Sequence, residues 1–284
     1  MQPLTPEEIR HAVKLALAED LGSGDATTLA TVPASATASA VMRAREPLVA
    51  AGLALAAAAF QELSPAAQIE RPAQDGQRVP ANAILLKIFG PAQPLLGAER
   101  VALNFVQRLS GIATLTAQFV DAVRGTPAEI LDTRKTTPGW RRLEKYAVTC
   151  GGGRNHRLGL FDMILIKDNH LAALRGAQPN AVAAAVARAR ARYSQLKIEV
   201  EADTLEQVEQ ALAAGADVIL LDNMDLARLR LAAQKCKGRA RTEASGGVNL
   251  TNVRAIAETG VDFISVGALT HSARAVDVGL DFEE

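Results

Sequence analysis

The 284-residue sequence contains few cysteines, few aromatic side chains and no long apolar run. Its two cysteines, Cys150 and Cys236, provide neither a disulfide framework nor the spacing of a metal site, so we expect buried thiols in a reducing compartment. No apolar run approaches the roughly 20 residues that a membrane-spanning helix needs. The first residues lack the basic and apolar regions of a signal peptide. We therefore expect a cytoplasmic protein with no membrane partner.

The sequence also lacks an excess of charge of either sign. Lysine plus arginine and aspartate plus glutamate number 31 each, which gives a formal net charge of +0. Because nucleic-acid-binding proteins usually carry a basic excess, we expect no nucleic-acid partner. Any concentration of positive charge must therefore be local.

The first part of the chain has the pattern of a mixed α+β region. The run Thr5-Pro6-Glu7-Glu8 is a capping box with proline at the first helical position, which predicts a helix from residue 5 to about residue 19. An alanine-rich helix is expected at residues 53–63, between strand-like runs at residues 37–45, 47–50 and 83–89.

A longer helical pattern follows at residues 97–123. Ser110-Gly111 is expected to interrupt this helix. Arg100 and Arg108 fall outside its apolar face, and from the residues alone both are expected on a solvated surface.

After residue 129 short apolar strands alternate with helices, which predicts βαβ units and a parallel sheet. The expected strands are residues 129–131, 163–166, 198–201, 218–221, 241–244 and 263–266, and the expected helices are residues 140–150, 180–193, 205–214, 226–235 and 250–258.

The predicted fold class is therefore α/β, with a C-terminal, incomplete parallel β/α barrel and an N-terminal α+β sandwich domain. The sandwich is expected at residues 1–112 and the phosphate-binding barrel at residues 113–274, with residues 275–284 packing back on the sandwich. An open doubly wound sheet is the alternative, although residues 133–138 are not the glycine-rich fingerprint expected after its first strand.

A cationic segment lies between the first two strands of this region. The first strand is followed by Arg134 and Lys135, and the second is followed by Lys167. Between them lie a glycine triplet at residues 151–153 and the run Asn155-His156-Arg157. Glycines let backbone N–H groups approach a ligand and the basic side chains supply fixed charge, so this segment predicts an anion site.

Polar residues also recur at the carboxyl ends of the later strands, where barrels build their active sites. Glu201 and Asp222 occupy such positions, and the turns Ser245-Gly246-Gly247 and Val266-Gly267-Ala268 follow the last two strands. Barrels frequently bind phosphate with the loops after their last two strands, so these turns predict a phosphate site.

Each of these residues also has a simpler interpretation. Glu201 and Asp222 are either ligands of Mg²⁺, which takes few protein oxygens, or carboxylates in salt bridges or helix caps. His156 alone is more typical of a hydrogen-bonded structural histidine, and the same interpretation is given to His11, His170 and His271.

Several segments along the chain form a set of specific motifs. They are EDLGSGDATT at residues 19–28, ERVALNFVQRLSGIAT at 99–114, LDTRKTTPG at 131–139, GGGRNHRLGLFDMILIKDNH at 151–170, EVEADTLEQ at 199–207, ILLDNM at 219–224, EASGGV at 243–248 and VGALTHSARAVDVGLDF at 266–282. These motifs resemble those of the quinolinate phosphoribosyltransferases (nicotinate-nucleotide pyrophosphorylases, carboxylating), and the resemblance covers essentially the whole chain. Trp140 departs from it mildly, since the family commonly has leucine after TPG.

The resemblance implies a reaction. Quinolinate and 5-phosphoribosyl-1-pyrophosphate, with Mg²⁺, would give nicotinate mononucleotide, pyrophosphate and CO₂ in de novo NAD biosynthesis. A paralogue that acts on another aromatic acid, such as nicotinate without decarboxylation, and a non-catalytic barrel that binds phosphorylated metabolites are the alternatives.

The resemblance also implies roles for individual residues. Arg134, His156, Arg157 and Lys167 would face the two quinolinate carboxylates, and Arg100 would reach in from a partner subunit of a homodimer. Glu201 and Asp222 would hold Mg²⁺ and the ribose hydroxyls. The 5-phosphate would lie against Ser245, Gly246, Gly247 and Gly267, and the catalytic set would be Lys135, Lys167, Glu201 and Asp222.

Overall fold

A computed structural model describes residues 3–283, and its internal contacts divide the chain into two compact units. The first unit is formed by the segments up to Ala117, from Arg142 to Gly152 and from Ser272 onward; the second is formed by Gln118–Arg141 and Gly153–His271. The segment 142–152 thus belongs to the first unit, although the sequence led us to expect residues 113–274 as one domain.

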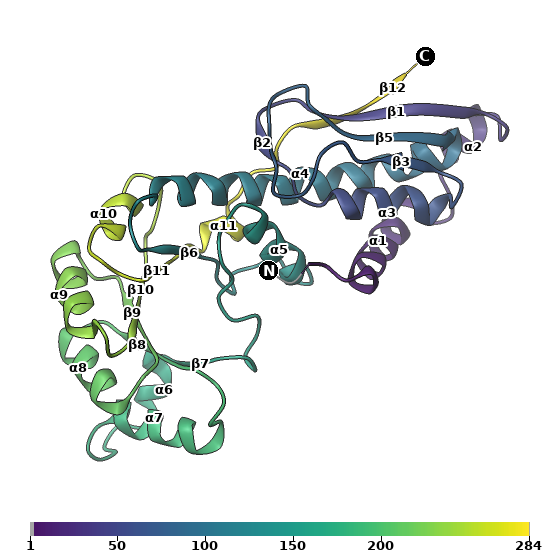
Figure 1. The fold of residues 1–284 in the computed structure, drawn as a ribbon. Coiled ribbons are helices and arrows are strands. Elements are labelled where there is room, and N and C mark those ends of the chain that lie inside the picture. Colours follow the sequence, from purple (N-terminus) through teal and green to yellow (C-terminus); the bar gives the residue numbers. More distant parts are fainter. Residues whose placement is uncertain (1–2, 284) are drawn as a thin grey trace. The chain divides into compact units, whose positions relative to one another are not determined.

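The first unit is built on a four-stranded antiparallel sheet with the order β12-β1-β5-β3 (Figure 1). Its strands are β1 (Thr37–Ala44), β3 (Gln68–Glu70), β5 (Ile84–Pro91) and β12 (Val278–Glu283), and the short strands β2 (Leu48–Val49) and β4 (Arg78–Val79) pair separately. Its helices are α1 (Pro6–Leu21), α2 (Ala26–Thr31), α3 (Leu53–Leu63), most of α4 (Ala92–Ala122) and α5 (Arg141–Cys150).

The sequence accounts for how this sheet is covered. In β5 the side chains of Leu86 and Ile88 are buried while those of Lys87 and Phe89 are exposed, which is the alternation of a strand with one face on a core. The predicted capping box of α1 is present, because Thr5 and Glu8 exchange side-chain to backbone hydrogen bonds.

Helix α4 corrects one expectation. It runs without a break through Ser110 and Gly111 over 31 residues. Gly111 is required by close packing, since a Cβ atom at this position would lie 2.0 Å from the backbone oxygen of Arg274. The Ser110 hydroxyl is buried and hydrogen bonds to the backbone of Ala51.

The expected surface position of Arg108 is also wrong. Its guanidinium donates to the buried carboxylate of Glu144 at 2.8 Å and to the carbonyl oxygen of Ala273 at 2.7 Å. A side chain that falls outside the apolar stripe of one helix can still be covered by a second segment of the chain. Arg100 on the same helix is exposed.

The second unit contains a six-stranded parallel sheet with the order β6-β11-β10-β9-β8-β7, flanked by helices. Its strands are β6 (Glu129–Leu131), β7 (Ile164–Ile166), β8 (Ile198–Ala202), β9 (Val218–Asp222), β10 (Arg241–Ser245) and β11 (Phe263–Ser265), and its helices are α6 (Asp168–Ala172), α7 (Ala181–Arg192), α8 (Leu205–Ala214), α9 (Leu226–Cys236), α10 (Val253–Ala257) and α11 (Ala268–His271).

The first strand β6 pairs with the last strand β11 and the others follow in sequence order, which is the order of a barrel open between β6 and β7, so the predicted incomplete β/α barrel and the α/β class are confirmed. The alternative of an open doubly wound sheet is not needed. Helix α8 shows how the sequence sets these elements: Thr204 and Gln207 form a capping box, and Gly215 ends the helix in the left-handed conformation.

Both cysteines are buried free thiols, as expected. None of the helices formed by residues 3–283 combines the length and the apolar character that crossing a membrane requires.

Candidate active site

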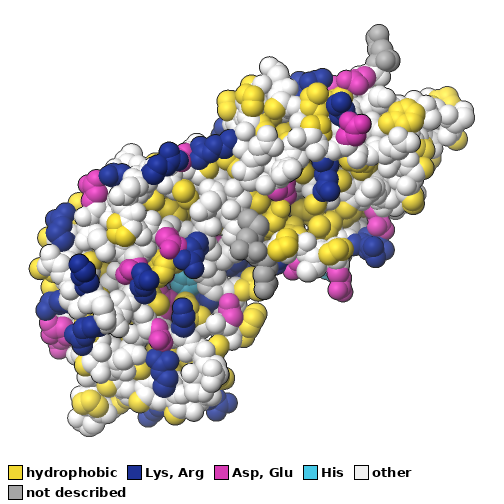
Figure 2. Space-filling model, viewed as in Figure 1, with side chains coloured by type: hydrophobic (Ala, Val, Ile, Leu, Met, Phe, Trp, Pro, Cys, Tyr) yellow, Lys and Arg dark blue, Asp and Glu magenta, His cyan; other side chains and the backbone are white. Residues whose placement is uncertain are grey.

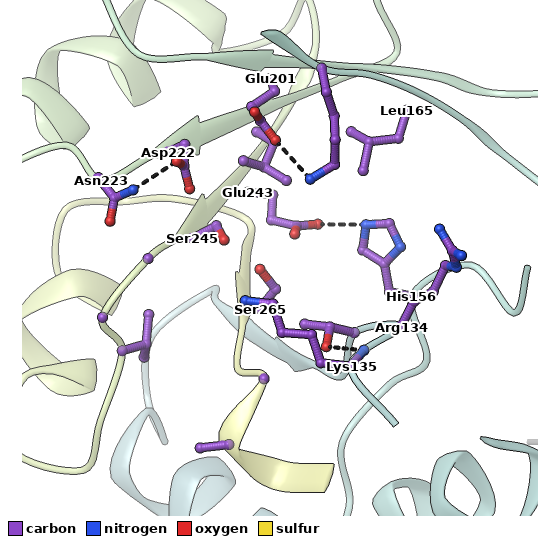
Figure 3. Close-up of a pocket in the computed structure, with 18 of the residues that line it drawn as sticks. Arg134, Lys135, His156, Leu165, Glu201, Asp222, Asn223, Glu243, Ser245 and Ser265 are labelled. Atoms are coloured by element: carbon purple, nitrogen blue, oxygen red, sulfur yellow. Dashed lines mark hydrogen bonds and ion pairs between the residues drawn. The ribbon is translucent and has the colours of Figure 1, made fainter. Parts of the chain in front are cut away.

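A cavity of about 660 Å³ opens at the carboxyl ends of the parallel strands in the second unit. It brings together the site residues expected within this unit, from loops that are far apart in the sequence (Figure 3). They are Arg134, Lys135, His156, Arg157, Lys167, Glu201, Asp222, Ser245, Gly246, Gly247 and Gly267. Arg100 belongs to the first unit and does not line this cavity.

Four lysine or arginine side chains and three carboxylates line this cavity, although the whole chain has no net charge. Arg134, Lys135, Arg157 and Lys167 all contribute to it. On the face of the second unit shown in Figure 2, lysine and arginine side chains surround a histidine, with acidic side chains between them. A local excess of positive charge attracts anionic ligands without raising the charge of the whole molecule.

Arg134 and Arg157 form the most positive part of the wall. Burial and the neighbouring Arg134 guanidinium lower the pKa of Arg157 below its usual value. Both side chains line the cavity, and a guanidinium suits a planar acceptor such as a carboxylate. Among residues 3–283 the buried Nε atom of Arg134 has no hydrogen-bond partner.

His156 is held by two buried carboxylates that the sequence analysis did not single out. Its Nε2 atom lies 3.0 Å from Oε2 of Glu199 and 3.4 Å from Oε2 of Glu243. The backbone N–H of Arg157 donates to its Nδ1 atom at 2.7 Å. Both ring nitrogens therefore have partners within the protein.

The charges of these three groups are coupled. Burial alone would lower the pKa of His156, but the hydrogen bonds to Glu199 and Glu243 raise it to about 10. Burial and the nearby Glu243 carboxylate raise the pKa of Glu199. A change in the charge of any one of these groups therefore alters the protonation of the other two.

Glu201 and Asp222 occupy the carboxyl ends of the neighbouring strands β8 and β9. Oε2 of Glu201 lies 3.2 Å from Nζ of Lys167, and Oδ2 of Asp222 accepts a hydrogen bond from Nδ2 of Asn223 at 2.7 Å. The salt-bridged alternative for Glu201 is thus present in this structure. Two partly exposed carboxylates on one cavity wall also fit Mg²⁺, which binds through one or two carboxylates and substrate oxygens.

Glycine turns form the side of the cavity that follows β10 and β11. Gly246 and Gly247 have φ angles of +100° and +60°, which side chains rarely adopt. At Gly267 a Cβ atom would lie 3.1 Å from both Lys135 and His271, so backbone rather than side chain faces the cavity there. Such turns suit a phosphate, because their N–H groups can approach its oxygens.

Lys135 is fixed through its backbone. Its carbonyl oxygen accepts a hydrogen bond from the buried Thr270 hydroxyl at 2.7 Å, and its N–H donates to the Thr133 hydroxyl at 3.0 Å. The cavity wall also includes His271, which the sequence analysis interpreted as structural.

The signals for the missed residues were present only in part. Glu199 lies on the charged face of the strand at residues 197–201, two positions before Glu201, so its direction could be inferred but not its partner. Glu243 lies in a mostly polar strand, RTEAS at Arg241–Ser245, where nothing distinguishes it from its polar neighbours. Asn223 follows Asp222 at the end of β9, where asparagine is an ordinary turn residue.

The barrel and its site define a β/α protein with a cavity at the carboxyl ends of its strands, lined by basic side chains, carboxylates and glycine turns. Comparison with known proteins gives the family. The model described as quinolinate phosphoribosyl transferase, C-terminal domain, matches residues 112–281, and the model of the N-terminal domain matches residues 25–110. The chain therefore belongs to the quinolinate phosphoribosyltransferase family.

Individual relatives agree over nearly the full length. The chain is 47% identical over 278 residues to a nicotinate-nucleotide pyrophosphorylase [carboxylating] of Mycobacterium leprae, with 96% of each protein covered. It is 44% identical to the chloroplastic enzyme of that name from Arabidopsis thaliana, covering 97% of this chain and 83% of the relative. The structure of the nicotinate-nucleotide pyrophosphorylase from Francisella tularensis superposes with a TM-score of 0.93 at 38% identity, covering 99% and 98% of the two chains.

Proposed function

We propose that this chain is a quinolinate phosphoribosyltransferase of de novo NAD biosynthesis. It converts quinolinate and 5-phosphoribosyl-1-pyrophosphate into nicotinate mononucleotide, pyrophosphate and CO₂. The observation that carries the proposal is a single cavity with Arg134 and Arg157 on one wall and glycine turns on the other. One wall suits a planar carboxylate and the other suits a phosphate.

Quinolinate binding is assigned to the basic wall. Arg134 and Arg157 pair with the two carboxylates, since a guanidinium matches a carboxylate through two parallel hydrogen bonds. Lys167 adds charge from the end of β7. Both nitrogens of His156 have protein partners, so this residue faces quinolinate with the surface of its ring and with the charge that it shares with Glu199 and Glu243.

The sugar-phosphate donor is assigned to the opposite wall. The N–H groups of the turns at Ser245, Gly246, Gly247 and Gly267 bind the 5-phosphate. Glu201 and Asp222 hold the ribose hydroxyls and are the residues that would hold Mg²⁺. When bound, Mg²⁺ neutralises charge on the pyrophosphate.

The residues of this chain mainly align two anions and neutralise a leaving group. Pyrophosphate leaves as C1 of the ribose gains oxocarbenium character, with Lys135 and Lys167 beside it. The pyridine nitrogen then forms the new bond to C1. Holding two reactants in line can supply about 7–11 kcal/mol of the barrier.

Decarboxylation follows from the charge on the new pyridinium. The bond from C2 to its carboxylate breaks, CO₂ leaves, and the electron pair stays on C2, where the positive nitrogen stabilises it. C2 then takes a proton from water. No covalent bond to the protein is required.

We further propose a homodimer or a higher homo-oligomer in which Arg100 of one subunit enters the site of another. The exposed position of Arg100 on α4 supports this, since its guanidinium is available to a second copy. Mixing an Arg100→Ala chain with a Glu201→Ala chain tests it. Restored activity in the mixed oligomer is expected, and activity that never exceeds that of the separate variants would contradict it. The cytoplasmic location stays a prediction.

The direct test of the function uses quinolinate labelled in the carboxylate at C2, with 5-phosphoribosyl-1-pyrophosphate and Mg²⁺. We expect nucleotide, pyrophosphate and labelled CO₂ in equal amounts. Nucleotide formed from nicotinate, with no CO₂ released from quinolinate, would favour the paralogue. Binding of both compounds without pyrophosphate would favour a non-catalytic protein.

A further inference from the structure

Asn223 connects two parts of the site that come from different strands. It follows Asp222 at the end of β9, and its Nδ2 atom donates to Oδ2 of Asp222 at 2.7 Å. Its backbone N–H donates to the carbonyl oxygen of Ser245 at 2.9 Å, which extends the pairing of β9 with β10 by one residue. The donor and acceptor atoms of its amide are fixed by this arrangement, because a carboxylate can only accept.

The other end of the same amide lies against the glycine turn. A Cβ atom on Gly246 would be 2.1 Å from Oδ1 of Asn223 and 2.7 Å from its Cγ. The space that a side chain at position 246 would occupy is therefore filled by Asn223. Figure 3 shows Asp222, Asn223 and Ser245 together on one side of the cavity, opposite His156 and Arg134.

The backbone of Asn223 supports a specific role for its side chain. Its φ angle is +52°, a left-handed conformation in which asparagine is the most tolerated residue after glycine. Glycine would adopt this φ angle without strain. The backbone conformation alone therefore does not account for a side-chain amide at this position or for its contact with Asp222.

We propose that Asn223 is a positioning residue that couples the two ends of the donor subsite. It holds the Asp222 carboxylate and the turn at residues 245–247 in one arrangement, so that a divalent cation at the carboxylates and a tetrahedral dianion at the turn bind cooperatively. The proposal rests on the proposed function for its choice of ligands. Its physical basis is that one planar amide contacts both the Asp222 carboxylate and the turn. A ligand that fixes the position of one of them therefore also fixes the other.

The experiment compares Asn223→Gly with a matched control, Asn82→Gly. Asn82 is also exposed, has a φ angle of +67° and donates its backbone N–H to a neighbouring strand, at the carbonyl oxygen of Ala44, but it lies in the first unit. The dissociation constant of Mn²⁺ is measured by electron paramagnetic resonance with and without saturating sulfate, at constant ionic strength. Sulfate serves as the probe for the phosphate turn.

In the native protein and in Asn82→Gly we expect sulfate to tighten Mn²⁺ binding about fivefold or more, within the usual range of coupling between sites. In Asn223→Gly this factor falls to about one. The KM for the sugar-phosphate donor rises about tenfold, which is the loss expected for a hydrogen bond to a charged group, while the KM for quinolinate stays within about twofold.

Asn223→Asp provides a second variant with the same shape. A carboxylate at this position repels Asp222, so it is expected to abolish the coupling as well. The proposal is overturned if sulfate has no effect on Mn²⁺ in the native protein, if either Asn223 variant keeps the coupling, or if Asn82→Gly loses it equally.

The binding measurement requires no turnover, so the two proposals fail separately. Native protein that shows the coupling but forms no nucleotide from quinolinate would contradict the proposed function while supporting the role of Asn223. Native protein that forms the nucleotide, but whose coupling survives in Asn223→Gly, would contradict the role of Asn223 alone.

Discussion

Replacing Gly111 by alanine should destabilise the first unit, although alanine is the better helix former. In the middle of a helix, alanine is favoured over glycine by roughly 0.5–1 kcal/mol. At position 111, however, the new Cβ atom would lie 2.0 Å from the carbonyl oxygen of Arg274 and 3.3 Å from Cα of Ala275. Real Cβ contacts stay above 3.0 Å, so backbone on one side must move by about an ångström.

Overpacking of this kind typically costs about 1–3 kcal/mol, and here the clash is with backbone rather than with a side chain that can rotate. We therefore expect a net loss of about 1–2 kcal/mol in the free energy of unfolding. For a large domain this lowers the midpoint of thermal unfolding by roughly 2–4 °C for each kcal/mol. Urea unfolding followed by circular dichroism gives the free energy directly.

The matched control is Gly97→Ala in the same helix. Its Cβ atom would meet Leu21 and Leu63 at 3.4 Å, which is ordinary van der Waals contact. This variant should be unchanged or more stable by up to about 1 kcal/mol. Equal effects of the two substitutions, or a stabilised Gly111→Ala protein, would refute the explanation of the unbroken helix.

The other predictions concern the site and pH. Glu201→Ala or Asp222→Ala should cut turnover with little change in the quinolinate dissociation constant. If the variant with both substitutions still depended on Mg²⁺, the assignment of these two carboxylates as Mg²⁺ ligands would be wrong. Arg134→Lys should raise the KM for quinolinate about tenfold and the KM for the donor much less, because lysine lacks the planar pair of donors; the reverse pattern in steady-state kinetics would exclude this role. The hydrogen bond from Arg274 lowers the pKa of the Glu46 carboxyl from 4.5 to about 2. The stability that this ion pair contributes is present above about pH 4.5 and is lost as the pH falls toward 2. In acid titrations the free energy of unfolding of Glu46→Gln should therefore fall less steeply than that of the native protein. Parallel curves for the two proteins would contradict this role of Glu46.

The sequence predicted the β/α unit well because its strands are short apolar runs with polar residues at their ends. Asp222 and Ser245, for example, end two neighbouring strands and line the same cavity. The glycine turns after β10 and β11 could be predicted from their sequence, and they line the cavity as expected; their role in phosphate binding stays a prediction. The motifs predicted the family, and the models that match residues 112–281 and 25–110 confirm it.

The features that the sequence did not predict depend on contacts between distant segments. Gly111 was interpreted as a break because the approach of Arg274 cannot be read from the local pattern. The same limit applies to Arg108, whose partner Glu144 is supplied by α5. The buried pair around His156 joins β8 and β10, and no periodicity within either strand indicates that they share one histidine.

The position of β12 has a consequence for how the chain is made. This strand pairs with β1 along its whole length, from Ala44 opposite Val278 to Ser39 opposite Glu283. During synthesis the sheet of the first unit therefore has an unpaired edge until residues 278–283 have left the ribosome, while the strands of the second unit are already available to pair. Because an open sheet edge can pair with other chains, nascent chains of this protein should depend on chaperones more than they would if the sheet of the first unit were complete before the second unit is made.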